Sequence, residues 1–478
     1  MTTTEQTIDR FVADTRAAVF VRRADNLLMI RPDKTLAINE SAAAILGALY
    51  EADGGGAARA LDALAPRLGV DRARLERDAV ELVQAVGAIL NEDYSPRPKL
   101  RLGTFRPGLV RYPTLAEIAL TYGCQNRCAF CYAASPQRGG ERRPMTTQQV
   151  KVVMERILHQ AHVPSLSFTG GEATLRPDLA ELVAHGKGIG LRVNLITNGI
   201  RAADEAYAAA LVRAGLASAQ VSLEAAEAGL HDRIVGRPGA FADTVAGVRN
   251  FQRLGIHVHT NTTLCAANLD HAKALIRFVA RDLKLRTLSM NMVIRTGAAR
   301  GDGVAMEVSY TEVGERLPGL LEIARAEGVR LVWYSPIPYC IFNPVLHGLG
   351  AKSCACVHGI LSVDPTGQVL PCSSFDEGIG SLLELPFPRI YRGRAARYWR
   401  ERHFAPPVCQ GCADLDVCGG GCPLYWDAAG SFAELPRPGA ADPKARARWE
   451  RRRRRGGSFG VPAPSPTPTT TDRARWVR

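Results

Sequence analysis

Strand-like and helix-like segments alternate over residues 113–325, and this alternation constrains the fold more than any other feature. Repeated strand–helix units imply a parallel sheet with right-handed crossovers. Functional groups in such sheets gather at the carboxyl ends of the strands. The expected strands are 115–121, 165–169, 191–197, 218–223, 256–263 and 286–293, and the expected helices are 147–161, 178–187, 203–214, 240–253, 268–281 and 311–327.

Three cysteines follow the first expected strand directly. Cys124, Cys128 and Cys131 form the run Cys-x3-Cys-x2-Cys, with Phe130 just before the third cysteine. Three thiolates at this spacing can hold three irons of a 4Fe–4S cluster and leave the fourth iron without a protein ligand. The alternative is a zinc knuckle, which needs four closed ligands. No further Cys or His lies within ten residues on either side of the run.

This cysteine run resembles the signature of the radical S-adenosylmethionine (SAM) enzymes, in which the open iron binds SAM. The resemblance continues at the ends of the later strands, and the matching residues are Gly170, Gly171, Glu172, Asn198, Ser222 and Arg233. It implies an α/β fold, namely a partial (β/α)6 barrel over residues 113–330.

The resemblance also implies roles for these residues. Gly170, Gly171 and Glu172 would bind the amino group of SAM, Ser222 its ribose, and Arg233 its carboxylate. Asn198 would belong to the pocket wall, and Phe130 is a further expected cofactor-binding residue. For Ser222 and Asn198 the alternative is ordinary strand-end hydrogen bonding, and for Arg233 it is a surface salt bridge.

A second group of cysteines lies in residues 331–440. Cys356-x10-Gly367-x4-Cys372 is followed by Cys409-x2-Cys412-x5-Cys418-x3-Cys422. This pattern resembles the SPASM domain, which binds one or two auxiliary 4Fe–4S clusters. The alternative is one or two structural zinc sites.

The resemblance implies how the C-terminal cysteines are shared between two clusters. One cluster would take Cys356, Cys372 and Cys422 together with Cys354 or Cys340, and the other would take Cys409, Cys412 and Cys418. The family pattern ends with one more cysteine, and this chain has none after Cys422. The second cluster must therefore use another ligand, for which Asp427 is one guess, keep an open iron, or be absent. Cys265 is expected to be a buried structural thiol.

Residues 1–95 precede the barrel and predict a separate small module. Three short strands near 19–21, 27–30 and 36–38 are followed by three helical patterns near 40–51, 57–68 and 72–89. Residues 29–39, 42–49 and 68–80 resemble the peptide chaperone of pyrroloquinoline-quinone biosynthesis. That resemblance implies a winged-helix-like module that binds the leader of a precursor peptide as an added strand near Leu36 to Ile38, beside the third helix. The alternative is a winged helix that binds DNA, but the helical pattern 72–89 carries both basic and acidic residues, which is a poor match to a phosphate backbone.

Charge and composition define the two remaining segments. Residues 96–112 are rich in Pro, Arg and Gly and predict a linker. Residues 443–478 contribute +9 of the net charge of +13, so the rest of the chain is nearly neutral, which argues against a nucleic-acid-binding protein. Residues 441–478 are expected to form a basic, Pro- and Thr-rich disordered tail. No signal peptide or membrane span is expected, and clustered cysteines favour a cytoplasmic protein.

Together these features predict a radical SAM maturase of a ribosomally made precursor peptide. The resemblance implies that a reduced cluster cleaves SAM to a 5′-deoxyadenosyl radical, which abstracts hydrogen from a peptide side chain and leads to a crosslink, a thioether or an unsaturated bond. The expected partners are the precursor peptide with its N-terminal leader and a reductant such as flavodoxin or ferredoxin. One alternative is a maturase of a folded partner enzyme, such as a sulfatase or a quinone-cofactor enzyme. Another is a zinc-binding DNA regulator.

Overall fold

The computed structural model describes residues 3–30, 34–52, 56–103, 110–135, 143–300 and 306–456. The chain divides into two compact units, Met1–Arg111 and Tyr112–Arg478. Within the described residues, no helix has both the length and the apolar character needed to cross a membrane. The two units are described separately below.

The first unit contains a small antiparallel sheet and four helices with their own apolar core. Asp71 caps the last helix by accepting a hydrogen bond from the Arg74 N–H, as its position before an apolar-periodic segment suggests. Helix α1 was not predicted, although Ile8 and Val12 are buried at helical spacing. The elements are α1 (Thr3–Thr15), β1 (Val19–Arg22), β2 (Leu27–Ile30), β3 (Lys34–Ile38), α2 (Glu40–Glu51), α3 (Gly56–Leu68), α4 (Arg72–Leu90) and β4 (Leu102–Gly103).

Strand β4 changes the expected binding edge of this sheet. The expected linker is not wholly irregular, because β4 pairs antiparallel with Ala37 and Ile38 of β3. The strand order is β1-β2-β3-β4, so the outer side of β3 is already occupied at two of the three positions that were expected to receive a peptide. The backbone of Asn39 extends this pairing by donating to the Arg101 carbonyl at 3.2 Å. A peptide could therefore add beside β3 only near Lys34 to Leu36 unless it displaced β4.

The second unit is built on the predicted parallel sheet. All six predicted strands are present in order, and each pairs in parallel with the next one along the chain. The strands are β5 (Leu115–Ala119), β6 (Ser165–Thr169), β7 (Arg192–Thr197), β8 (Ser218–Ser222), β9 (His257–Leu264) and β10 (Thr287–Met292). The crossover helices are α5 (Thr147–His159), α6 (Leu179–Gly188), α7 (Glu205–Ala214), α8 (Ala228–Val235), α9 (Ala240–Arg253), α10 (Ala272–Arg281) and α11 (Tyr310–Ala326).

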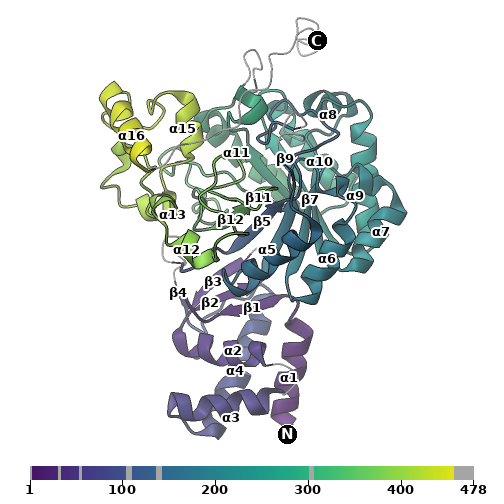
Figure 1. Cartoon of the computed structure of the whole chain (residues 1–478), viewed down its shortest axis with the longest axis vertical. Helices are drawn as coiled ribbons and strands as arrows, with labels where there is room; N and C mark the ends of the chain where they lie inside the picture. Colours follow the sequence, from purple (N-terminus) through teal and green to yellow (C-terminus); the bar gives the residue numbers. More distant parts are fainter. Residues whose placement is uncertain are drawn as a thin grey trace, which may run out of the picture. The chain divides into compact units, whose positions relative to one another are not determined.

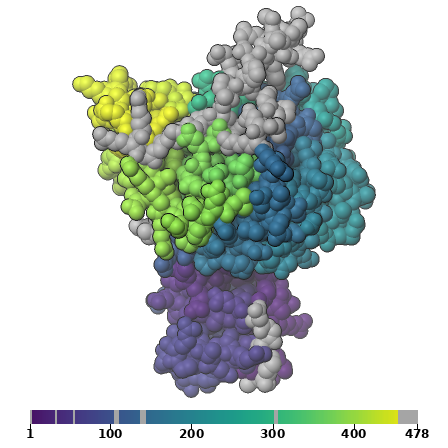
Figure 2. Space-filling view, in the orientation of Figure 1, coloured from purple at the N-terminus to yellow at the C-terminus, as the bar shows by residue number. Residues whose placement is uncertain are grey.

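Three further strands extend this sheet at its two edges. Strand β11 (Arg330–Trp333) pairs with β10, and β12 (Ile360–Val363) pairs in parallel with β5 and carries the antiparallel β13 (Val369–Leu370). The cysteine-rich segment thus continues the sheet instead of forming a detached appendage. In the space-filling view the green C-terminal segment lies directly against the blue β5–α6 region, where the Arg156 guanidinium donates to the carbonyls of Leu382 and Leu385 (Figure 2).

The remaining helices belong to the C-terminal, cysteine-rich part of the second unit. Figure 1 shows helices α6, α7 and α9 on one flank of the sheet and helices α12, α13, α15 and α16 on the other. The helices of this C-terminal part are α12 (Phe387–Tyr391), α13 (Arg394–Arg400), α14 (Leu415–Cys418), α15 (Pro423–Ala429) and α16 (Pro443–Gly456).

Helix α16 corrects the expectation of a disordered tail from residue 441. Trp449 is fully buried, and its indole N–H donates to the Phe404 carbonyl at 2.6 Å. Arg446 stacks over the same indole ring and donates to the Trp426 carbonyl. The run of arginines suggested disorder, but the buried apolar side chains of Ala445 and Trp449 are sufficient to hold this arginine-rich helix against the rest of the unit. The remainder of the expected tail, 457–478, lies outside the described residues.

Candidate active site

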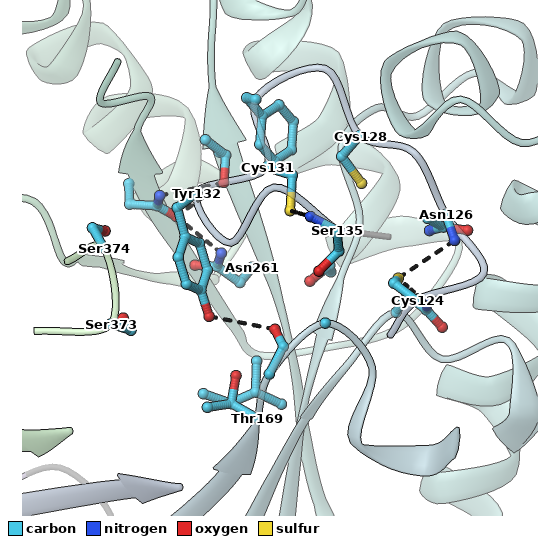
Figure 3. Close-up of a pocket in the computed structure, with 18 of the residues that line it drawn as sticks. Cys124, Asn126, Cys128, Cys131, Tyr132, Ser135, Thr169, Asn261, Ser373 and Ser374 are labelled. Atoms are coloured by element: carbon cyan, nitrogen blue, oxygen red, sulfur yellow. Dashed lines mark hydrogen bonds between the residues drawn. The ribbon is translucent and has the colours of Figure 1, made fainter. Parts of the chain in front are cut away.

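A cavity of about 290 Å³ opens at the carboxyl ends of the barrel strands. Its walls come from strands β5 to β10, from the loop after β5, and from Ser373 and Ser374 in the cysteine-rich segment. Figure 3 shows these two serines approaching from a separate loop, opposite the cysteine side chains. The cavity therefore joins the barrel and the cysteine-rich segment in one site.

The three predicted cysteines line this cavity from the loop after β5. The end of α8 holds the loop in place, because the backbone N–H groups of Arg127 and Ala129 donate to the last carbonyls of that helix. Burial raises the pKa of the Cys124 thiol to about 12 and also raises the pKa values of the Cys128 and Cys131 thiols. The neutral thiols would lose protons on binding iron, so cluster binding is coupled to proton release.

Gly170 and Gly171 bring the end of β6 against the backbone that leads into the cysteine loop. The Gly171 N–H donates to the Thr121 carbonyl at 2.7 Å, and the Glu172 N–H donates to the Gly123 carbonyl at 2.9 Å. A Cβ atom at residue 170 would lie 2.1 Å from the Thr121 oxygen, and one at residue 171 would lie 2.3 Å from the Gly123 oxygen. Only glycine permits this approach. Both glycines also line the cavity.

Glu172 faces the protein interior instead of the cavity. Its carboxylate accepts hydrogen bonds from Thr174, from the Thr197 hydroxyl at 2.8 Å, and from the Asn198 N–H at 2.8 Å. Burial raises the pKa of Glu172, although these donors oppose the shift. In this structure the residue links the ends of β6 and β7, a role that its place in the resemblance did not indicate.

The other predicted SAM contacts divide into two groups. Phe130, Asn198 and Ser222 all line the cavity, and the Asn198 amide nitrogen lies 3.9 Å from the Cys124 sulfur. Arg233 does not line it, because its side chain is exposed on α8. The expected contact of Arg233 with SAM therefore stays a prediction.

Two buried carboxyl groups and one half-buried tyrosine of the cavity were not among the predicted site residues. Glu117 on β5 accepts a hydrogen bond from the Ser362 hydroxyl at 2.6 Å, and burial raises its pKa. Burial likewise raises the pKa of Glu224 to about 8. The Tyr132 hydroxyl lies 3.5 Å from the Gly170 carbonyl (Figure 3). Glu117 could have been recognised as a site residue from the sequence, because it is a charged residue within an expected strand whose neighbours are apolar.

The residues around the cavity fit a cluster with a bound small molecule. The Asn126 side-chain oxygen is buried at the cavity and has no hydrogen-bond partner among the described residues, so it offers an acceptor to a ligand that carries N–H donors. No group of three or more Cys, His, Asp or Glu side chains in the described ranges has the arrangement that a single metal ion would require. Thiols that surround a common space suit a larger cluster better than one zinc ion.

The C-terminal cysteines form two groups. In the first group the Cys354 and Cys356 sulfurs are 3.3 Å apart, and Cys356 also forms a hydrogen bond with Cys372. Cys422 lies close enough to interact electrostatically with Cys354 and Cys372. The second group includes Cys409, Cys412 and Cys418, which line a separate cavity of about 80 Å³. Cys265 is fully buried and lines neither cavity, as expected for a structural thiol.

Comparison with known proteins agrees with this geometry. The model of the radical SAM superfamily matches residues 118–279, and the SPASM model, described as an iron–sulfur cluster-binding domain, matches residues 354–413. A PqqA peptide cyclase of Rhodopseudomonas palustris is 30% identical over 325 residues, which cover 65% of this chain and 82% of that protein. An AdoMet-dependent heme synthase of Oleidesulfovibrio alaskensis is 27% identical over 63% of this chain and 80% of that protein.

A solved structure gives a similar result for the fold. SuiB of Streptococcus suis bound to its precursor peptide SuiA superposes with a TM-score of 0.64. The match covers 86% of this chain and 96% of that chain, at 14% identity. The cofactors that follow from the two matched domains are SAM and 4Fe–4S clusters. The chain belongs to the radical SAM superfamily, as an enzyme that carries a SPASM iron–sulfur cluster-binding domain after its partial barrel.

Proposed function

We propose that this enzyme modifies side chains of a ribosomally made precursor peptide. The observation that carries the proposal is the cavity where three barrel thiols and a loop of the SPASM domain meet. The peptide cyclases among the relatives and the precursor-bound SuiB support a peptide as the substrate class. Cytoplasmic location and a flavodoxin or ferredoxin as the electron donor remain part of this proposal.

Cys124, Cys128 and Cys131 are the proposed ligands of the SAM-binding cluster. When bound, the cluster and SAM together supply a carbon-centred radical that removes a hydrogen atom from the substrate. Asn198 positions the first ligand, since its amide reaches the Cys124 sulfur and its backbone is fixed by Glu172.

Glu117 and Glu224 are the proposed proton-exchanging groups on the substrate side. Both carboxyl groups line the cavity and are buried, and the pKa of Glu224 is raised to about 8. A carboxyl with such a pKa exchanges a proton near neutral pH. If the modification is oxidative, the ionised fraction of Glu224 can take the proton that the substrate loses, and an auxiliary cluster would accept the electron.

Cys354, Cys356, Cys372 and Cys422 are the proposed ligands of the first auxiliary cluster. The proposal is supported by the hydrogen bonds of Cys356 with Cys354 and Cys372 and by the electrostatic interactions of Cys422 with Cys354 and Cys372. Four thiolates are the usual complement of a closed 4Fe–4S cluster. Cys354, rather than Cys340, is the better candidate for the position that the sequence left open.

The first unit is the proposed leader-binding module. Its four-stranded sheet has the order β1-β2-β3-β4, and Lys34 to Leu36 extend beyond the two positions of β3 that pair with β4. A peptide strand added there would gain backbone hydrogen bonds, while neighbouring side chains would provide selectivity. Removing the leader from the substrate should therefore abolish or strongly slow the modification.

The test is co-expression of the full chain with the short peptides encoded beside its gene, followed by mass spectrometry. We expect a defined mass change in one peptide with the wild-type chain and none with Cys128→Ala. Cys265→Ala is the matched control, because it also removes a buried thiol but lies outside the cavity. An unchanged peptide with an iron-loaded wild-type enzyme would contradict the proposal.

A maturase of a folded partner enzyme is the remaining alternative within the same chemistry. The two functions differ in their need for a leader. Modification of the core peptide alone, at the same rate as the full precursor, would favour the alternative. Dependence on the leader supports the peptide maturase.

A further inference from the structure

We propose that Cys340 is the fourth ligand of the second auxiliary cluster, which completes the set formed by Cys409, Cys412 and Cys418. Cys340 follows β11 and is 69 positions before Cys409 in the chain, so it lies outside the SPASM spacing pattern. The inference rests on the proposed function in one respect: it assumes that the enzyme binds auxiliary clusters. It does not depend on the substrate. Cys340 would fill the fourth ligand position of this cluster, for which the family pattern uses a last cysteine that this chain lacks.

The four thiols line one cavity. Cys340 and its neighbours Pro338 and Tyr339 line the 80 Å³ space together with Cys409, Cys412 and Cys418. Cys340 is also close enough to Cys409 and Cys418 to interact with them electrostatically. The Tyr339 N–H donates to the Cys418 sulfur at 3.3 Å, which ties the Cys340 loop to this group. Four thiolates around one space are the ligand set of a closed 4Fe–4S cluster.

The surroundings of this cavity favour a negatively charged occupant. The Arg437 guanidinium donates to the Cys412 sulfur at 2.9 Å and also forms a hydrogen bond with Cys340. Hydrogen bonds and a fixed cation at the sulfurs stabilise thiolates and their clusters. Gly420, with φ of +76°, passes so close that an added Cβ would lie 3.5 Å from the Cys409 sulfur and 2.8 Å from Pro406.

The other possible ligands are less suitable. Asp427 does not line the cavity, because its carboxylate pairs with Arg300 at 2.9 Å and with Arg446 and Arg453. Cys354 belongs to the first group of thiols. Asp414 does line the cavity and is therefore the rival that an experiment must exclude.

Ligation by Cys340 would limit what the second cluster can do. A cluster with four thiolate ligands has no open iron for a substrate or for SAM. Its role in this enzyme is then the transfer of electrons between the first auxiliary cluster and the outside of the protein. Cys340 is exposed, so this cluster lies near the surface, where an electron partner can approach.

The test is the metal content and electron paramagnetic resonance spectrum of the full chain after anaerobic reconstitution with iron and sulfide. Three closed or nearly closed clusters correspond to about twelve irons per chain. We expect Cys340→Ala to lose between about one and four irons, with a 3Fe–4S signal where only one is lost. Asp414→Asn and Cys265→Ala should retain the wild-type content. Wild-type iron content in Cys340→Ala, or a loss confined to Asp414→Asn, would overturn the assignment.

A second measurement on the wild-type chain covers the case in which the variant fails to fold. Cys340 is exposed in the described structure, so N-ethylmaleimide should alkylate it in the apoprotein. Reconstitution should protect it, as shown by peptide mass spectrometry. Equal labelling of Cys340 before and after reconstitution would overturn the assignment. Both readouts are independent of peptide modification, so failure of this inference and failure of the proposed function are distinguishable.

Discussion

Gly171→Ala should disrupt the contact that brings the end of β6 against the cysteine loop. The new Cβ would lie 2.3 Å from the Gly123 oxygen, 2.6 Å from the Tyr122 oxygen and 2.8 Å from the Ser135 hydroxyl. Two of these atoms are backbone oxygens, so they cannot move away as a flexible side chain would. The two segments would have to separate by roughly 1 Å to reach ordinary van der Waals distance.

This separation would break the two hydrogen bonds that join the segments. The N···O distances of 2.7 Å at Gly171 and 2.9 Å at Glu172 would both exceed the usual hydrogen-bond range. Leaving buried backbone groups unpaired costs about 1–3 kcal/mol each. Since the chain can relax in part, we expect the free energy of unfolding to fall by about 2–5 kcal/mol.

Urea unfolding of the apoprotein, followed by circular dichroism, measures this loss. Gly188→Ala at the end of α6 is the matched control, because nothing lies within 4 Å of its added Cβ. We expect the control to be neutral or stabilising by up to about 1 kcal/mol. Gly171→Ala should also impair cluster loading, since the displaced backbone leads directly into Cys124. A loss below about 1 kcal/mol together with normal loading would refute the reasoning.

Three further predictions concern other buried contacts. Trp449→Ala should lower the free energy of unfolding by about 3–5 kcal/mol, measured with urea, because it removes a fully buried indole that anchors α16. Burial lowers the pKa of His231 to about 4, so its protonation destabilises the fold below pH 6.5; between pH 7 and 4.5 the wild type should lose about 2–3 kcal/mol more than His231→Gln. Glu172→Gln should cost about 1–3 kcal/mol, because an amide cannot accept all the hydrogen bonds from Asn198 and its neighbours, whereas Glu181→Gln on the surface should cost under about 1 kcal/mol.

The barrel could be predicted from the sequence because its signals are local. Each strand, such as Arg192–Thr197, is a short apolar or β-branched run followed by a helix of clear periodicity. The pairing of β12 with β5 could not be predicted, because Leu361 and Ala116 are far apart in the chain and no local pattern records their register. The same applies to β4, whose two residues form a strand only by pairing with β3.

The site was predictable where spacing carries the chemistry. Cys124, Cys128 and Cys131 lie together because one loop holds them, so their spacing alone was informative. Arg233 is exposed on α8 and is not among the residues that line the cavity, so its contact with SAM stays a prediction. Cys340 could not be assigned from spacing, since only the fold brings the loop after β11 to Cys418.

The transfer of deuterium from the peptide into 5′-deoxyadenosine tests the central claim most directly. The reconstituted enzyme would be incubated anaerobically with SAM, a reductant and a precursor peptide expressed in deuterated medium. The account predicts 5′-deoxyadenosine that carries deuterium, in amounts that follow the modified peptide, because hydrogen is removed from a peptide side chain. Formation of 5′-deoxyadenosine without deuterium, at the same rate with and without the peptide, would contradict it.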